Sequence, residues 1–597
     1  MNKQHTFHIP VMGVAYTIDS PLKVAPYGID SVISLVDNVL LEKLRESYSN
    51  KFLLPYKAIS KKVDDFQAKR ITAYLNMIQE LTLNKFNELK DNFENKKEEV
   101  YDYFEMLPDG SSLKDEFFKK VKSLDLETMK NWLKDHLQMG SIDVNIMTKV
   151  DKINYKNGEA LPSEFNDAHA ALRGYANSDL ESTLVLSAGM SPRLYAYIEN
   201  FEDFYPDKTG FIKKKIALKV SDYRSALIQG KFLAKKGIWV SEYRIESGLN
   251  CGGHAFATDG FLMGPILEEF RLHRDDLYQS VYQVLQQTLE SKEKPLPEKL
   301  EMRITAQGGV GTAEEHEFLL DYYKVDSVGW GSPFLLVPEA TTVDKYTQNE
   351  LARAKEKDLY LSDISPLGVP FNSLRTASAT IKKLEKAKKG RAGSSCPKQY
   401  LVSNTEYTER HICTASRQYQ HLKLKELETK NLDDAQYQKT YNKIIAPECL
   451  CVGLSEPAII THNINYKIKD NGVTVCPGPN MAYFDKVISL KDMIGHIYGR
   501  INVMKNENRP NMFIKELNLY LDYLKNQLEE AGDNLDKRQQ KYFDKFKKNM
   551  EAGIEYYEQL FDNSKDKFQA MKKRIFSDLQ NGKNKLSRLF NQVNIGS

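Results

Sequence analysis

One short stretch of the sequence brings together residues suited to proton transfer. GLNCGGHAFATDG (248–260) places a histidine directly after two glycines. An imidazole with its ordinary pKa of ~6.5 exchanges protons at neutral pH, and Gly252 and Gly253 let a flat ligand approach the backbone. His254 is therefore a candidate acid or base, or it only hydrogen-bonds a cofactor or caps the loop. Cys251 is either a reactive thiol or a small buried spacer.

Two glycine clusters further along the chain suit an anion. They lie in AQGGVGT (306–312) and VGWGSPF (328–334). Glycines let amide N–H groups approach a phosphate, and a following helix adds a favourable partial charge. We therefore expect a phosphate site here, with tight turns as the alternative. The candidate residues are Gly308, Gly309, Gly311, Gly329, Gly331 and Ser332, with the hydroxyl of Thr312 as a further donor.

The secondary-structure elements that position these loops can be predicted from the alternation of apolar and polar segments along the chain. Short runs rich in Val, Ile and Leu alternate with longer segments of helical spacing, which predicts βα units and a parallel sheet. Eight such units favour an α/β fold of the (β/α)₈ TIM-barrel type, because closure leaves no exposed edge. In barrels, the loops after the seventh and eighth strands commonly bind phosphate. The eight runs are 8–16, 29–37, 142–151, 182–191, 214–222, 238–256, 301–312 and 325–334.

The remaining segments divide the chain into four parts. We expect a barrel from 1–39 and 139–350, a helical insertion at 40–138 after the second strand, a cysteine-bearing region at 351–484 and a helical extension at 485–597. Such an insertion usually covers the active-site face; the alternative is a solvated helical pair without a catalytic role. The extension is amphipathic, which predicts packing on the barrel or on another subunit of a homo-oligomer, with a coiled-coil arm as the alternative.

Five of the six cysteines lie in the post-barrel region. Only ECLC is closely spaced, and a proline follows two of the cysteines. Three readings stay open: an iron–sulfur cluster, a structural zinc site and ordinary reduced thiols. The candidate metal ligands are Cys396, Cys413, Cys449, Cys451 and Cys476.

Composition excludes several classes of protein. The chain of 597 residues has 84 Lys and Arg against 81 Asp and Glu, a net charge of +3, which argues against a general nucleic-acid binder. No stretch reaches ~18 apolar residues, so we expect no membrane span. The N-terminus lacks the pattern of a signal peptide, and cysteine is sparse, so we expect a cytoplasmic protein.

In this order, the motifs resemble a known family. GLNCGGHAF resembles the E-A-G-G-H loop of the FMN-dependent nitronate monooxygenases (formerly 2-nitropropane dioxygenases) and enoyl-ACP reductases. AQGGVGT and VDSVGWGSPFLLVPEA are similar to the phosphate loops of that family, and IDVNIM to its third strand. SPLGVPFNSL (365–374) resembles a segment of longer members, which include trans-acting enoyl reductases of polyketide and polyunsaturated fatty-acid synthesis. The first strand, VMGVAYTID, departs from the family's Gln-Gly-Pro-Met segment, and Trp330 interrupts the second phosphate loop.

The resemblance implies a cofactor and a set of roles. Met12 and Gly13 would lie against FMN, Asn145 and Lys219 would reach its ring or ribityl chain, and His254 would be the catalytic histidine. The glycines Gly252, Gly253, Gly308, Gly309, Gly311, Gly329 and Gly331, with Ser332, would hold the flavin and its phosphate.

The implied function is an FMN-dependent oxidoreductase. The resemblance leaves open a nitronate monooxygenase and a reductase of enoyl thioesters bound to an acyl carrier protein. Its substrate would be a small molecule or carrier-bound, and its electron donor NAD(P)H or a redox protein. The residues alone also allow a phosphate-ligand barrel enzyme without flavin, such as an isomerase, or an interaction protein built on a degenerate barrel.

Overall fold

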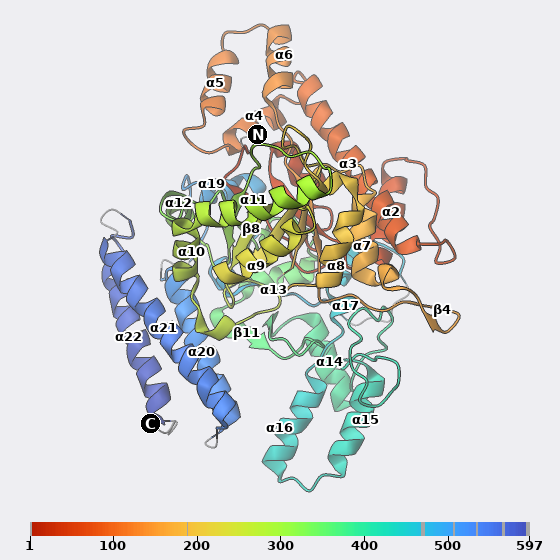
Figure 1. Cartoon of the computed structure of the whole chain (residues 1–597), viewed down its shortest axis with the longest axis vertical. Helices are drawn as coiled ribbons and strands as arrows, with labels where there is room; N and C mark the ends of the chain where they lie inside the picture. Colours follow the sequence, from red (N-terminus) through yellow and green to blue (C-terminus); the bar gives the residue numbers. More distant parts are fainter. Residues whose placement is uncertain are drawn as a thin grey trace.

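Eight parallel strands close into a barrel in the computed structural model (Figure 1). The structure describes residues 3–187, 189–466, 472–505, 508–532, 535–563 and 567–592. Each expected run supplies one strand, and the strands pair in sequence order around the barrel, so the predicted (β/α)₈ fold is confirmed. The strands are β1 (Phe7–Ile9), β2 (Asp30–Ser34), β3 (Ile142–Ile146), β6 (Ser182–Leu186), β7 (Lys214–Val220), β8 (Val240–Glu246), β9 (Arg303–Gln307) and β10 (Ser327–Gly329).

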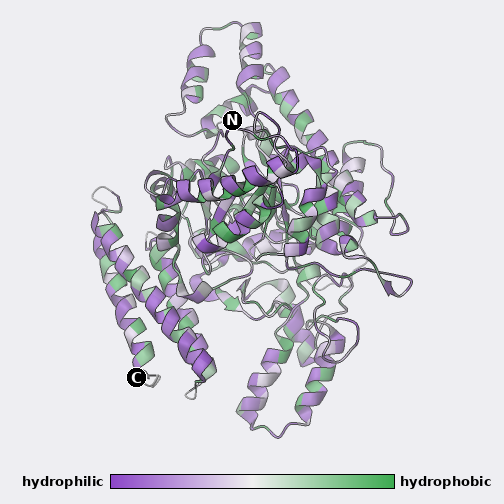
Figure 2. Ribbon diagram, in the orientation of Figure 1, coloured by the Kyte–Doolittle hydropathy of each residue, from purple (hydrophilic) through white to green (hydrophobic). Residues whose placement is uncertain are grey.

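Alternation along the strands separates the barrel interior from the main core. Val32, Val185 and Ala217 form a small cluster of their own. Elsewhere the interior is polar: Arg244 Nε lies 2.7 Å from Glu242 Oε1, and both side chains are buried. Successive side chains of a strand point to opposite faces, so the residues between these positions pack against the helices. Figure 2 shows the resulting pattern, with hydrophobic residues gathered on the central strands.

A layer of helices surrounds the strands. Helix α3 is long and packs against α1, α2 and α7, and α9 packs against α11. The helices of the layer are α1 (Ser20–Val24), α2 (Asn38–Lys51), α3 (Phe66–Asp91), α7 (Asp167–Ala176), α8 (Pro192–Tyr197), α9 (Tyr223–Ala234), α10 (Met263–Leu272), α11 (Arg274–Ser291), α12 (Ala313–Asp321) and α13 (Lys345–Arg353). A short hairpin, β4 (Tyr155–Lys156) and β5 (Glu159–Ala160), projects after β3.

The second half of the insertion forms a separate cluster. Helices α4 (Lys97–Met106), α5 (Ser112–Lys120) and α6 (Leu126–His136) share their own hydrophobic core. The Tyr103 hydroxyl donates to the carbonyl of Gln138, which precedes β3, and Tyr27, which precedes β2, packs on the same core. The cluster therefore lies at the amino ends of these strands, at the top of Figure 1. The expectation that the insertion covers the active-site face is wrong for this half, and α3 belongs to the helical layer.

The post-barrel region lies at the opposite end of the barrel. It contains the hairpin β11 (Leu359–Ser362) and β12 (Phe371–Leu374), which form a two-stranded antiparallel sheet, and a projecting helical pair, α15 (Arg417–Glu428) and α16 (Asp434–Ile445). The other helices are α14 (Ser378–Lys388), α17 (Leu450–Gly453) and α18 (Glu456–Thr461).

The C-terminal extension returns to the barrel. Helix α19 (Leu490–Ile497) contacts α4, and α20 (Met512–Ala531), α21 (Lys537–Asn563) and α22 (Lys572–Gln592) form a bundle that packs against α10. Packing on the barrel is therefore observed within one chain. In the described ranges no single helix has the length and apolar character to cross a membrane, although the bent pair Asp434–Ile445 and Leu450–Thr461 meets both criteria when taken together.

Candidate active site

A cavity of about 210 Å³ opens at the carboxyl end of the barrel. Every barrel strand contributes to its wall a residue at or next to its carboxyl end, and the post-barrel region closes it from above with residues such as Phe371, Leu454 and Asn480. The strand residues are Pro10, Ser34, Asn145, Ser187, Lys219, Glu246, Gln307 and Gly329.

The cavity gathers nearly all of the site residues predicted from the sequence. Of the predicted catalytic and phosphate-site residues, Gly311 and the further donor Thr312 are absent from its wall. A Cβ at Gly311 would lie 2.7 Å from the guanidinium of Arg509. The predicted residues that line the cavity are Met12, Gly13, Asn145, Lys219, Gly252, Gly253, His254, Gly308, Gly309, Gly329, Gly331 and Ser332.

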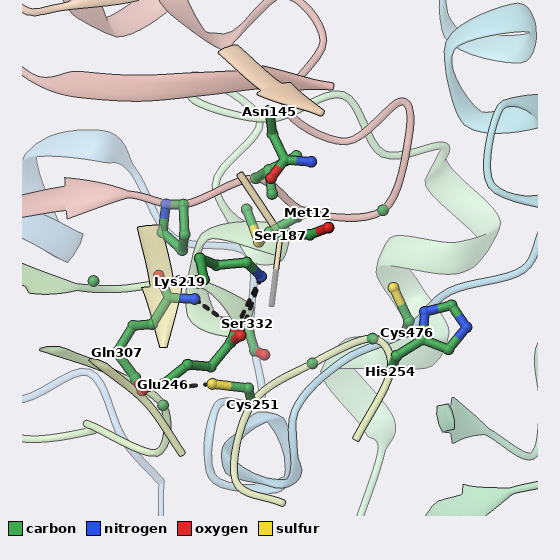
Figure 3. Close-up of a pocket in the computed structure, with 18 of the residues that line it drawn as sticks. Met12, Asn145, Ser187, Lys219, Glu246, Cys251, His254, Gln307, Ser332 and Cys476 are labelled. Carbon is green, nitrogen blue, oxygen red and sulfur yellow. Dashed lines mark hydrogen bonds and ion pairs between the residues drawn. The ribbon is translucent and has the colours of Figure 1, made fainter. Parts of the chain in front are cut away.

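A charged network lies on the floor of the cavity (Figure 3). Lys219 Nζ lies 3.1 Å from Glu246 Oε2, and Gln307 Nε2 donates to Glu246 Oε1 at 2.6 Å. Glu246 and Gln307 were not among the predicted residues. Each is the last residue of its strand and points inward, and Lys219 is the last but one residue of β7. The alternation of side chains along the strands could therefore have identified Glu246 and Gln307.

Three buried oxygens of wall residues have no hydrogen-bond partner within the described chain. They are Asn145 Oδ1, Asn250 Oδ1 and Gln307 Oε1. A buried polar atom without a partner is costly, so such atoms suit a ligand that presents N–H or O–H groups. The floor of the cavity is therefore built to hydrogen-bond a polar ligand.

His254 lies at the side of the cavity. Its Nε2 is 2.7 Å from Ser365 Oγ, and its ring meets Phe371 edge-on. In Figure 3 the imidazole points away from Lys219 and Glu246. Burial, with added repulsion from Lys149 and Lys219, lowers the pKa of His254 to about 4, so the ring is neutral at pH 7.

The histidine loop is fixed by residues from far along the chain. The Gly253 amide donates to the carbonyl of Cys476, and the Asn372 side chain donates to the carbonyl of Cys251. Burial raises the pKa of the Cys251 thiol well above its usual value, and Glu246 adds to the rise. Since the thiolate is the nucleophile, this favours the spacer interpretation of Cys251.

The glycines after β9 make room for protein side chains. Gly309 has a φ of +83°, and a Cβ there would lie 2.0 Å from Asn250 Nδ2. At Gly308 a Cβ would meet the sulfur of Cys251 at 2.6 Å. These glycines therefore allow the loops after β8 and β9 to pack closely together.

Arg509 holds the loop after β9 from its outer side. Its guanidinium is buried, with Nη1 2.7 Å from Glu315 Oε1 and Nε donating to Asn480 Oδ1 at 2.7 Å. Nη2 donates to the carbonyl of Gly309. Glu315 in turn accepts from the amide of Gly311 at 2.9 Å. One arginine of the C-terminal region thus connects both ends of the glycine loop.

The loop after β10 is more open. A Cβ at Gly331 would meet nothing closer than Pro10 Cγ at 3.5 Å. Ser332 begins the short 3₁₀ helix Ser332–Leu336, in which Pro333 has no amide hydrogen and the Phe334 amide donates to the Gly331 carbonyl at 2.9 Å. The Ser332 hydroxyl accepts from the Gly478 amide at 2.7 Å. The space beside Gly331 is therefore the feature of this loop that leaves room for a ligand.

Glu516 anchors the bundle beneath the histidine loop. It accepts from Ser247 Oγ at 2.5 Å and from the Met263 amide at 2.8 Å. Burial raises the pKa of its carboxyl to about 7. Asn250 Nδ2 donates to the carbonyl of Met512, so the segment after β8 is tied to the start of α20 at two points.

The cysteines fall into two groups. Cys251 and Cys476 line the cavity. Cys396, Cys413, Cys449 and Cys451 lie close enough to interact electrostatically, and the first two share a small buried cluster with Ala415. Across the described residues, no group of three or more His, Cys, Asp or Glu side chains is arranged to hold a metal ion. The expectation of an iron–sulfur or zinc site thus finds no support in this arrangement.

Comparison with solved structures finds proteins of low sequence identity, three of which are FabK, MlnA and nitroalkane oxidase. No protein-family model matches the chain. No curated protein matches it. FabK from Thermotoga maritima aligns at 12% identity and a TM-score of 0.32 over 68% of this chain and 84% of its own. The enoyl reductase domain of MlnA from the macrolactin biosynthesis cluster of Bacillus amyloliquefaciens aligns at 16% and 0.32 over 68% and 87%. Nitroalkane oxidase from Streptomyces ansochromogenes aligns at 9% and 0.33 over 83% and 94%. Similarity this low carries no argument about function. The evidence for the barrel is the pairing of the chain's own strands, and a function has to be argued from the geometry of the cavity.

Proposed function

We propose that this protein is an FMN-dependent oxidoreductase of the nitronate monooxygenase and enoyl reductase type. The observation that carries the proposal is the convergence of the histidine loop and the open Gly331 loop on one cavity at the carboxyl end of the barrel. Those are the motifs by which the sequence resembles this family. The unpaired oxygens of Asn145 and Gln307 add a floor suited to a ligand with several N–H and O–H groups.

The residues divide the cofactor between them. Gly331 and Ser332 would hold the phosphate, since a ligand can approach the backbone there. Asn145, Gln307 and Lys219 would hydrogen-bond the ribityl chain and the ring. Bound FMN supplies the redox chemistry by accepting or delivering a hydride equivalent.

His254 would manage the proton of the substrate. Its neutral imidazole, hydrogen-bonded to Ser365, can accept a proton from a carbon acid or donate a hydrogen bond to a carbonyl. An imidazole with a pKa of about 4 is a weak base, so an anion bound beside Lys149 would raise that pKa and strengthen it. Substrate assays distinguish nitronate oxidation from reduction of an enoyl thioester, which can be small or carrier-bound. For the reduction, NAD(P)H and a redox protein are the alternative electron donors to be compared.

An absorption spectrum of the purified protein tests the cofactor. We expect the two flavin bands, with a stoichiometry near one FMN per chain after reconstitution, and no iron or acid-labile sulfide in the same sample. Absence of bound flavin after reconstitution would overturn the proposal and favour a phosphate-ligand barrel enzyme.

Substitution of the histidine tests its role. His254→Ala should retain FMN and lower kcat by roughly 10²- to 10⁴-fold, the usual contribution of a general acid or base. Unchanged turnover of both nitronates and enoyl thioesters in the FMN-loaded variant would remove His254 from the mechanism.

A further inference from the structure

A second cavity, of about 480 Å³, adjoins the first. The two share Lys149, Glu246, His254, Phe256 and Val369 as a common partition. The far wall of the second cavity comes from the loop after β7 and from Tyr523 on α20. If the first cavity holds FMN, as the proposed function requires, a reacting molecule must occupy a space that shares its wall. The second cavity meets this condition.

The carboxylates of the second cavity are already neutralised. Glu246 is paired with Lys219, and Asp259 lies 2.5 Å from Lys545 of α21. Each negative charge in the wall therefore has a cation of its own, and neither pair leaves a net charge to attract a ligand.

Lys149 is the exception. Within the described ranges its ammonium forms no ion pair or hydrogen bond; it lies 4.4 Å from the centre of the Phe256 ring. The wall thus carries one uncompensated positive charge, next to an aromatic face and to His254. A charge beside low-dielectric walls attracts a counter-charge more strongly than it does in open water.

We propose that the second cavity is the substrate chamber, and that Lys149 selects substrates that carry a single negative charge, such as a carboxylate, close to the reacting carbon. One cation matches one anionic group, whereas a phosphate dianion is usually held by several donors. The flat ring of Phe256 and the side chain of Val369 favour an unsaturated, apolar body behind that group.

Isothermal titration calorimetry with a charged and a neutral probe of the same shape tests this inference. The FMN-loaded protein is titrated with cinnamate and with cinnamide. Wild type should bind cinnamate at least ~10-fold more tightly, and the preference should shrink as ionic strength rises. Lys149→Met should reduce the preference to within ~2-fold, and Lys149→Arg should keep most of it, because the charge is retained.

A matched control separates this site from general surface charge. Lys156 lies on the same post-β3 segment, is paired with Asp64 and lines neither cavity, so Lys156→Met should leave the preference intact. Ala257 lines the second cavity but not the first, so Ala257→Trp should abolish cinnamate binding while FMN still binds.

The outcomes distinguish the two proposals. Failure of FMN to bind would end the proposed function. Binding of FMN together with equal affinities for cinnamate and cinnamide, or a preference that survives in Lys149→Met, would overturn this inference alone.

Discussion

Two helical additions to the barrel differ in what they touch. Helices α4 to α6 form their own core at the amino ends of β2 and β3, and no residue of 40–138 lines either cavity. The C-terminal region instead sends Arg509 and Glu516 to the loops that form the cavity. The end of the barrel on which an addition lies therefore decides whether it serves stability alone or also shapes the site.

The strongest test of this difference removes Arg509. Arg509→Met leaves Glu315 buried without its partner, so we expect a loss of about 3–5 kcal/mol in the free energy of unfolding. FMN affinity should fall as well, because the loop after β9 loses its hold. Denaturant titration and FMN titration measure both effects.

The matched control for Arg509 is a surface arginine of the same region. Arg574 donates to the carbonyl of Asn508 and is partly exposed, so Arg574→Met should change stability by no more than about 0.5 kcal/mol. Equal effects of the two substitutions would mean that Arg509 has no special role.

Phe117 offers the complementary test in the insertion. Its ring is fully buried and stacks on Phe104 with centroids 3.9 Å apart. Phe117→Ala should destabilise the cluster by about 3–5 kcal/mol, yet leave FMN affinity unchanged. A large loss of FMN affinity, measured below the unfolding transition, would show that the insertion reaches the site and would break the comparison.

Glu516 should make the anchoring of the bundle depend on pH. Its folded pKa of about 7 lies above the ~4.3 of an unfolded glutamate, so its stabilising contribution is full at low pH and is lost as pH rises through 7. The loss accumulates between pH ~4.3 and about 7 and should approach about 4 kcal/mol above pH 8. Denaturation of wild type and Glu516→Gln across pH 5–8 measures it, and the variant should lack this slope. If the stability of wild type and of Glu516→Gln changed with pH in the same way, groups other than Glu516 would cause the pH dependence.

The two glycine loops give the finest test. Gly309→Ala would force a Cβ against Asn250 at a positive φ, so it should cost about 2 kcal/mol of stability. Gly331→Ala should cost less than about 1 kcal/mol, because no protein atom lies closer than 3.5 Å to the new Cβ, but it should weaken FMN binding. If Gly309→Ala weakened FMN binding and Gly331→Ala did not, the loop after β9 would be the one that binds the phosphate.

Local sequence patterns were enough to predict the barrel. The eight runs are short, apolar and separated by helices, and each became a strand in sequence order. The same patterns could have identified Glu246 and Gln307, which hold the last inward positions of their strands, as Lys219 nearly does. Successive residues of a strand point to opposite faces, so the inward-pointing residues of the site can be predicted from the local sequence.

Long-range partners were beyond such reasoning. Arg509 lies some 200 residues from the glycines that it holds, and nothing in its neighbourhood marks it as part of the site. Gly311 shows the same limit: it lies outside the wall of the cavity, and a Cβ there would meet Arg509, a contact that the local sequence does not show. For the insertion, the sequence left open a cover over the active-site face and a solvated helical pair, because sequence does not show at which end of a barrel an excursion packs.

The reach of Arg509 back to Gly309 also sets an order of events during synthesis. The last barrel strand ends at Gly329, and Arg509 is added about 180 residues later, a delay of roughly 10–40 s at ordinary translation rates. A nascent barrel would therefore close before its glycine loop is held in place. The loops that form the cavity would therefore be fixed only after Arg509 has been synthesised.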